Sequence, residues 1–189
     1  MSNGSGKDYV VTIDHMTAFG AIIQWFARIE CLMQGAMAGI VGMNTAETMM
    51  LTATMGYSAK KDTLQSLLKL PHPFKAHVER INWFLGEVHK YNGLRNYIAH
   101  SMWIEGKRPD SIKPMSVIVR GGSGKYLGID EEERDYLFEE LIVIADELSA
   151  RHDEFQKFLR ANGILRNIDR NTEPSSSETS PSEGKPSAK

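Results

Sequence analysis

Residues 19–37 read FGAIIQWFARIECLMQGAM, a stretch in which large apolar side chains return at nearly every turn of a helix. A period of about 3.6 residues is typical of an α-helix with one buried face. The expected face comprises Phe19, Ile23, Phe26, Met33 and Met37, flanked by Ile22 and Ile29. The stretch therefore predicts a long helix, beginning near His15, that packs against the rest of the domain.

Helical patterns continue through most of the remaining chain. Asn44 can cap a short helix that reaches Met55, a third helix is expected over 58–70, and a fourth begins at Phe74. We expect the fourth to continue, kinked at Gly93, through residue 103. The last helix carries an apolar stripe of Leu137, Leu141, Ile144, Leu148, Phe155 and Leu159.

Residues 105–130 have a different pattern. Met115–Val119 is rich in β-branched residues, glycines follow at 121–124, and Tyr126–Ile129 can form a return strand. The sequence therefore predicts an all-α fold: an antiparallel helical bundle with a small β-hairpin or loop insertion before the last long helix.

Composition indicates the compartment and the domain limits. The 189 residues include a single cysteine, and the most apolar window contains charged residues, so we expect a soluble, cytoplasmic protein without a secretory signal or a membrane span. The serine- and proline-rich end has too few apolar residues to fold. We expect a flexible N-terminus over 1–13, one helical domain over 14–166 and a disordered tail over 167–189.

The net charge of −2 hides a basic zone. Residues 60–125 contain twelve lysines and arginines against five aspartates and glutamates, and four of the six histidines. Such a zone can attract the phosphates of a nucleic acid. The alternative is that these charges are the solvated faces of amphipathic helices. We predict Lys90, within this zone, as a substrate contact.

The stretch 93–103, GLRNYIAHSMW, contains the candidate catalytic residues. On a helix, Leu94, Ile98 and Met102 face the core, whereas Asn96 and His100 stack on the other side and Arg95 lies between the two. Trp103 is expected one turn beyond His100, where it could stack on a base. Histidine titrates near neutrality and can move a proton to or from a ribose hydroxyl. Arginine matches phosphate oxygens with its fork of donors.

Glu30 lies at the angular centre of the first apolar stripe, so we expect its carboxylate to be buried and paired. Arg95 is the expected partner, with Glu30 holding the guanidinium in place. A simple ion pair between helices, or a rim position that stays wet, is the alternative.

Arg95, Asn96 and His100, with four residues between the arginine and the histidine, resemble the R-x4-6-H motif of the HEPN superfamily. The resemblance covers most of residues 14–165. It implies a homodimer in which two copies of the motif face each other across a cleft. In catalytic members this forms a metal-independent endoribonuclease that leaves a 2′,3′-cyclic phosphate. The resemblance makes His100 the acid/base residue, Arg95 the phosphate clamp and Asn96 the supporting polar group.

No other motif competes with this interpretation. His72, His77 and His89 lack zinc spacing with one another or with Cys31, and the glycines before Lys125 lack the spacing of a phosphate-binding loop, so we expect neither a metal nor a cofactor. The leading hypothesis is a dimeric ribonuclease, as in a toxin or stress-response effector. The alternative is a non-catalytic helical dimer that binds RNA, a nucleotide or a protein partner, such as an antitoxin.

Overall fold

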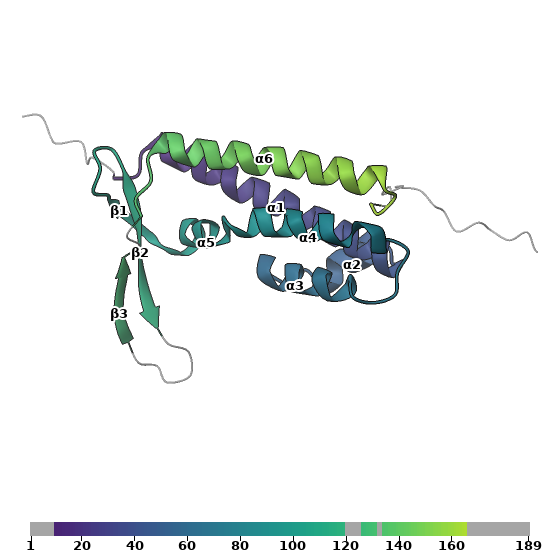
Figure 1. The fold of residues 1–189 in the computed structure, drawn as a ribbon. Helices are drawn as coiled ribbons and strands as arrows, with labels where there is room; N and C mark the ends of the chain where they lie inside the picture. Colours follow the sequence, from purple (N-terminus) through teal and green to yellow (C-terminus); the bar gives the residue numbers. More distant parts are fainter. Residues whose placement is uncertain (1–9, 120–125, 132–133, 166–189) are drawn as a thin grey trace, which may run out of the picture.

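The computed structural model describes residues 10–119, 126–131 and 134–165 of the chain. Two long helices, α1 (Ile13–Val41) and α6 (Phe138–Ala161), lie side by side along most of their length (Figure 1). Both run in the same direction, because His15 contacts Phe138 at one end and Gly39 lies against Ile164 at the other. The described part of the chain is mostly helical, as predicted.

Three shorter helices pack beside these two. They are α3 (Tyr57–Leu67), α4 (Val78–His89) and α5 (Asn92–His100), preceded by α2 (Thr45–Leu51) and by the 3₁₀ turn η1 (Lys75–His77). α4 is antiparallel to α6, since Arg80 pairs with Glu154 and Tyr91, just beyond α4, contacts Glu147. The expected antiparallel arrangement is therefore correct for α4 against α6 and wrong for α1 against α6. α1 and α6 are parallel because α4 brings the chain back along the bundle before α6 begins.

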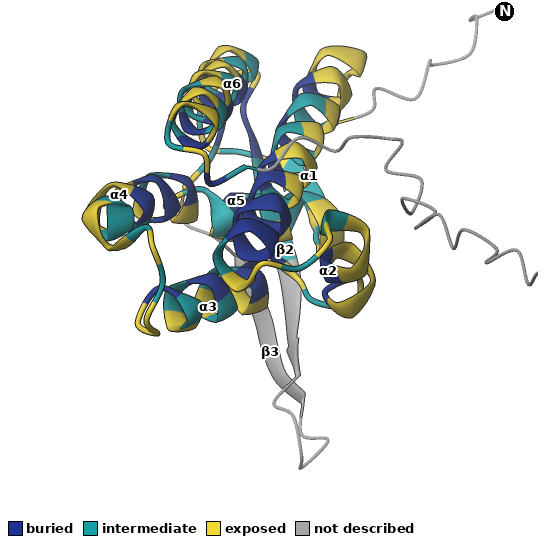
Figure 2. Cartoon of the chain, turned by 90° about the vertical axis from the view of Figure 1, so that its right-hand side faces the viewer, coloured by how far each residue is buried: buried dark blue, intermediate teal, exposed yellow. Residues whose placement is uncertain are grey.

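α1 is the central helix, with the other helices around it (Figure 2). Thr12 caps its first turn by accepting a hydrogen bond from the His15 backbone N–H at 3.3 Å. Gly42 ends it in the left-handed conformation, with φ 74°. The buried apolar residues of α1 include Ala18, Ile22, Phe26, Ile29, Met33 and Met37. The buried face is thus turned from the predicted one: Ile22 and Ile29 lie at its centre, and Phe19 and Ile23 at its edge.

Side-chain capping also explains the next helix. Asn44 accepts a hydrogen bond from the Ala46 backbone N–H at 2.7 Å, which begins α2 as the sequence predicted. α2 ends at Leu51 rather than Met55. Gln34 of α1 donates to Thr52 at 2.6 Å, both residues being buried, and this hydrogen bond joins α2 to the central helix.

The motif helix is shorter than the sequence predicted. The chain turns at Lys90 and Tyr91, so α4 and α5 are separate helices, and α5 ends at His100 because Ser101 adopts an extended conformation. The next residues form β1 (Met102–Glu105). Trp103 is therefore in a strand, not one helical turn beyond His100, and Met102 is exposed rather than in the core.

The predicted hairpin is part of a three-stranded antiparallel sheet in the order β1-β2-β3. β2 (Ile112–Val119) pairs with β1 and with β3 (Tyr126–Glu131). The glycine-rich turn at 121–124 lies outside the described residues, as do the segment 1–9 and the tail 167–189. The sheet extends from one end of the helical bundle (Figure 1).

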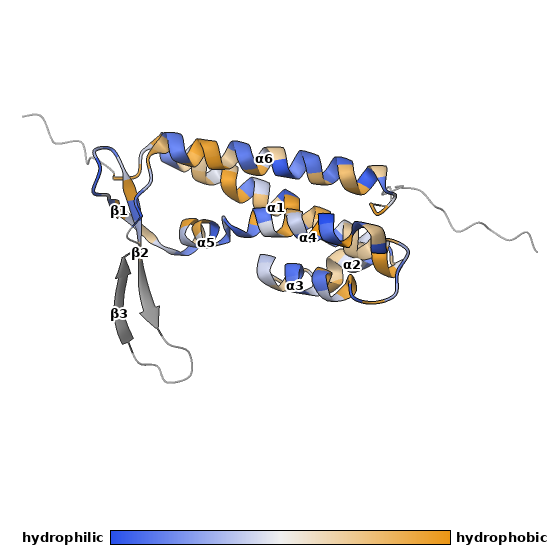
Figure 3. Cartoon of the chain, viewed as in Figure 1, coloured by the Kyte–Doolittle hydropathy of each residue, from blue (hydrophilic) through white to orange (hydrophobic). Residues whose placement is uncertain are grey.

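Hydropathy follows this arrangement. Hydrophilic and hydrophobic residues recur together along the length of α6, as expected of a helix with one buried side (Figure 3). Within the described residues, no helix combines the length and the apolar character that crossing a lipid bilayer requires.

Candidate functional site

The motif residues lie on different sides of α5. Asn96 and His100 are exposed one turn apart, whereas Arg95 is half-buried and turned toward α1. The Arg95 Nη1 donates to the Asn96 Oδ1 at 3.2 Å, so the structure brings these two side chains together. Among the described residues, no hydrogen bond or ion pair joins His100 to Arg95 or Asn96.

Glu30 is nearly buried, as predicted, but its main partner is not Arg95. The Nζ of Lys60 lies 2.5 Å from Glu30 Oε2, and the Nη2 of Arg95 lies 3.9 Å from Glu30 Oε1. The side chains of Glu30 and Lys60 are 13% and 8% exposed. The sequence did not predict Lys60 as the partner of Glu30. Its spacing from Tyr57 and Leu64 places it on the buried side of α3, which was the available signal.

The cluster of Glu30, Lys60 and Arg95 holds two cations against one carboxylate. The Nε of Arg95 is buried and has no hydrogen-bond acceptor among the described residues. Tyr57, which packs nearby, supplies no second anion: burial and the Glu30 charge raise the pKa of its hydroxyl, and this hydroxyl donates to the Leu85 carbonyl at 3.1 Å. The cluster therefore has positive charge and donors in excess of its own acceptors.

Trp103 belongs to an aromatic group at the base of the sheet. Its ring lies 4.6 Å from the Phe19 ring and 6.0 Å from the Tyr136 ring, measured between centroids. The indole N–H is buried without a hydrogen-bond partner in the described chain. Trp103 is half-buried, so in a single chain it packs under Tyr136 instead of projecting beside the motif.

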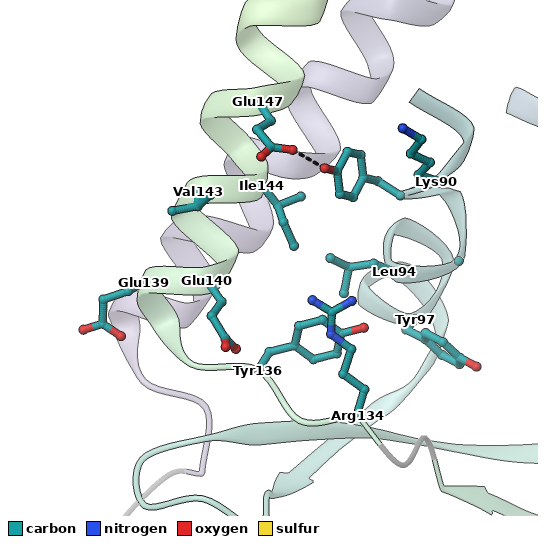
Figure 4. Close-up of a pocket in the computed structure, with 12 residues that line it drawn as sticks. Lys90, Leu94, Tyr97, Arg134, Tyr136, Glu139, Glu140, Val143, Ile144 and Glu147 are labelled. Carbon is teal, nitrogen blue, oxygen red and sulfur yellow. Dashed lines mark hydrogen bonds between the residues drawn. The ribbon is translucent and has the colours of Figure 1, made fainter. Parts of the chain in front are cut away.

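A pocket of about 720 Å³ lies between α5 and α6. Its α5 side comprises Lys90, Tyr91, Gly93, Leu94 and Tyr97. Its α6 side comprises Glu139, Glu140, Val143, Ile144 and Glu147, and Arg134 and Tyr136 close the bottom (Figure 4). Lys90, the predicted substrate contact, is thus on the wall of the pocket, where it pairs with Glu87. Arg134 and Tyr136 were missed because they lie in a connecting segment without periodicity.

The guanidinium of Arg134 lies over the Tyr136 ring, 4.9 Å from its centroid. At the opposite end, the Tyr91 hydroxyl donates to Glu147, as the dashed line in Figure 4 marks. Burial and this hydrogen bond raise the pKa of Tyr91 to about 12, so its hydroxyl stays protonated near neutral pH. Both ends of the pocket therefore present polar groups, with apolar side chains between them.

No group of three or more histidine, cysteine, aspartate or glutamate side chains in the described chain could hold a metal ion. Comparison with known proteins adds no relative to this picture: no family model matches the chain, and searches of curated proteins and of solved structures found no match either.

Proposed function

We propose that the chain is a metal-independent endoribonuclease that acts as a homodimer of HEPN type, with Arg95, Asn96 and His100 at a site shared between two copies. One observation supports it most: the Arg95 side chain is 27% exposed, belongs to a cluster with excess positive charge, and lies beside two exposed polar residues on the same helix. Both Asn96 and His100 are exposed, so a substrate can reach their side chains.

These residue types suit phosphoryl transfer from the 5′-oxygen to the 2′-oxygen within the RNA chain. His100 takes the proton of the ribose 2′-hydroxyl, whose oxygen then bonds to the adjacent phosphorus. The bond from phosphorus to the 5′-oxygen breaks, and that oxygen receives a proton from an imidazolium. Arg95 binds the phosphate oxygens, where negative charge increases in the transition state. The products are a 2′,3′-cyclic phosphate and a 5′-hydroxyl.

Helix geometry explains why a second copy is needed. Residues five apart on an α-helix are separated by about 140° around its axis. Arg95 is accordingly directed toward Glu30 of the same chain, whereas His100 is exposed at the end of α5. A second α5 across a twofold axis supplies the complementary group to each motif. Two imidazoles then serve the two proton transfers, one as base and one as acid.

The test is cleavage of a structured RNA by the purified full chain in EDTA. We expect cleavage to persist in the chelator and to fall about 10²–10⁴-fold in His100→Ala. His89→Ala is the matched control, because His89 is also exposed and also the last residue of its helix. It should cleave as the parent does.

Other outcomes would contradict the proposal. Cleavage that EDTA abolishes, or that His100→Ala retains, removes the proposed mechanism. RNA binding that weakens with salt but yields no product supports the non-catalytic dimer instead.

A further inference from the structure

The pocket between α5 and α6 has a lining that suits a flat aromatic ring. Tyr91, Tyr97 and Tyr136 contribute aromatic side chains from three different positions on its wall. Leu94 and Ile144 point toward each other across its middle (Figure 4). Aromatic and apolar walls of this kind favour the face of a nucleobase, which stacks on aromatic side chains.

Charge excludes a phosphate as the occupant. The lining has two cations, Lys90 and Arg134, against three carboxylates, Glu139, Glu140 and Glu147. Lys90 is already paired with Glu87, and Glu140 with Arg108. A phosphate would meet a lining whose formal charge is negative, whereas a neutral base meets no such repulsion.

The polar groups at the two ends of the pocket match the hydrogen-bonding edges of guanine. Arg134, at the lower end in Figure 4, has parallel N–H groups of the kind that bind the O6 and N7 atoms of guanine. Glu147, at the upper end, accepts from the Tyr91 hydroxyl through Oε2. Because each carboxylate oxygen has two lone pairs, Glu147 can also accept from the N1–H and the amino group of guanine. Adenine, cytosine and uracil do not offer this pair of acceptors together with this pair of donors.

We propose that this pocket binds a guanine base of the RNA that the motif cleaves. The assignment to RNA rests on the proposed function, but binding of the base does not. Tyr97 connects the two sites: it lines the pocket and lies three residues before His100, on the neighbouring side of α5. A nucleotide held in the pocket would place its own sugar–phosphate linkage toward the exposed end of α5.

Calorimetric titration of the full chain with the four ribonucleosides tests the binding directly. Guanosine should bind more tightly than adenosine, cytidine or uridine. Arg134→Ala should reduce this preference about 5- to 100-fold, since it removes the two donors to O6 and N7. Arg160→Ala, an exposed arginine near the other end of α6, is the control and should bind guanosine as the parent does.

A second pair of variants tests the location of the site. Gly93 lines the pocket, and an added Cβ there meets nothing within 4 Å, so Gly93→Phe should place a ring at the pocket wall and abolish guanosine binding while the chain remains folded. Gly86 is equally unobstructed but lies on α4 outside the pocket, so Gly86→Phe should leave binding unchanged. Circular dichroism checks that each variant folds.

The outcomes separate this inference from the nuclease. Chelator-resistant cleavage by a chain that binds the four nucleosides equally, or that binds guanosine despite Gly93→Phe, would overturn the guanine site and leave the nuclease standing. Guanosine binding that depends on Arg134, in a chain that cleaves no RNA, would support the site and contradict the proposed function.

Discussion

Two arginines of this chain, Arg108 and Arg95, differ in how fully their donors are hydrogen-bonded to neighbouring groups of the same chain. Arg108, in the loop between β1 and β2, donates from Nε to Asp135 at 2.8 Å and from Nη1 to Glu140 at 2.7 Å. Its Nη2 donates to Glu140 and to the Asp135 carbonyl, both at 2.7 Å. Arg95 has one hydrogen bond, to Asn96, one ion pair at 3.9 Å to Glu30, and a buried Nε without an acceptor in the described chain.

This difference distinguishes an arginine that stabilises the fold, Arg108, from one that is available to a ligand, Arg95. The donors of Arg108 are used within the chain, and they fix the β1–β2 loop and Asp135 to the first turn of α6. The hydrogen bonds to Glu140 and Asp135 raise the pKa of Arg108. The hydrogen bonds from the Arg108 backbone N–H and from Ser111 lower the pKa of Asp135. The donors of Arg95 are not all used, and Lys60 already neutralises Glu30. The Arg95 side chain is 27% exposed and makes one hydrogen bond in the described chain, so its terminal nitrogens can bind a ligand without disrupting the fold.

The largest expected effect is on catalysis. Arg95→Ala should slow RNA cleavage about 10²–10³-fold, because it removes charge stabilisation from the transition state. Its melting temperature should stay near the parent's, since Lys60 remains paired with Glu30. Arg108→Ala should show the reverse: a lower melting temperature with cleavage retained at temperatures where it is folded.

Thermal unfolding and initial cleavage rates, measured on the same preparations, check both variants. If Arg95→Ala melts far below the parent and Arg108→Ala does not, the two arginines have the opposite roles to those described.

The next effect is on stability. Glu30→Gln leaves the buried Lys60 ammonium without a carboxylate, and breaking such a pair costs about 3–5 kcal/mol of unfolding free energy. Glu30→Gln combined with Lys60→Met should recover most of this loss, because no charge is then left buried. Urea unfolding measures both. A single variant as stable as the parent would mean that the pair stays hydrated.

A smaller effect concerns pH. Hydrogen bonds from Arg108 and from the Leu137 backbone hold the pKa of Glu140 at about 2, against its ordinary 4.5. Since the folded pKa is the lower one, the stabilisation is complete above about pH 5 and is lost as the pH falls toward 2. Glu140→Gln should flatten this decline, as followed by urea midpoints between pH 7 and pH 3. Equal slopes in parent and variant would show that the pair does not contribute.

The smallest effect is at Lys90. This exposed side chain pairs only with Glu87 in the described structure, so Lys90→Ala should leave the melting temperature unchanged. If Lys90 contacts a phosphate of single-stranded RNA, the slope of log affinity against log salt should decrease by about 0.7. Filter binding over a salt series measures this slope. An unchanged slope would remove Lys90 from the RNA interface.

Local sequence predicted much of this fold and part of the site. The apolar period over residues 19–37 gave α1, and the Asn44 cap gave α2. The burial of Glu30 followed from its place in that period. Its pairing with Lys60 did not, because the partner's identity depends on how α3 packs against α1.

Tertiary pairing also overrode the helical pattern around the motif. Residues 102–105 form β1 because Met102 pairs with Met115 and Glu105 with Ile112, partners that local periodicity cannot indicate. This is why Trp103 lies against Phe19 and Tyr136 instead of on α5. The pocket was missed for the same reason, since its wall combines α5 with a segment about forty residues later in the chain.

Cleavage by mixed dimers tests the shared site most directly. Parent and His100→Ala chains, unfolded together in equal amounts and refolded, would pair at random, so about a quarter of the dimers would carry His100 in both copies. If the His100 side chains of both copies act on one phosphate, chelator-resistant cleavage should fall to about a quarter of that of the all-parent sample at the same total concentration. A value of about one half would mean that a single His100 is enough for each site, and it would contradict the proposal that two imidazoles act on one phosphate.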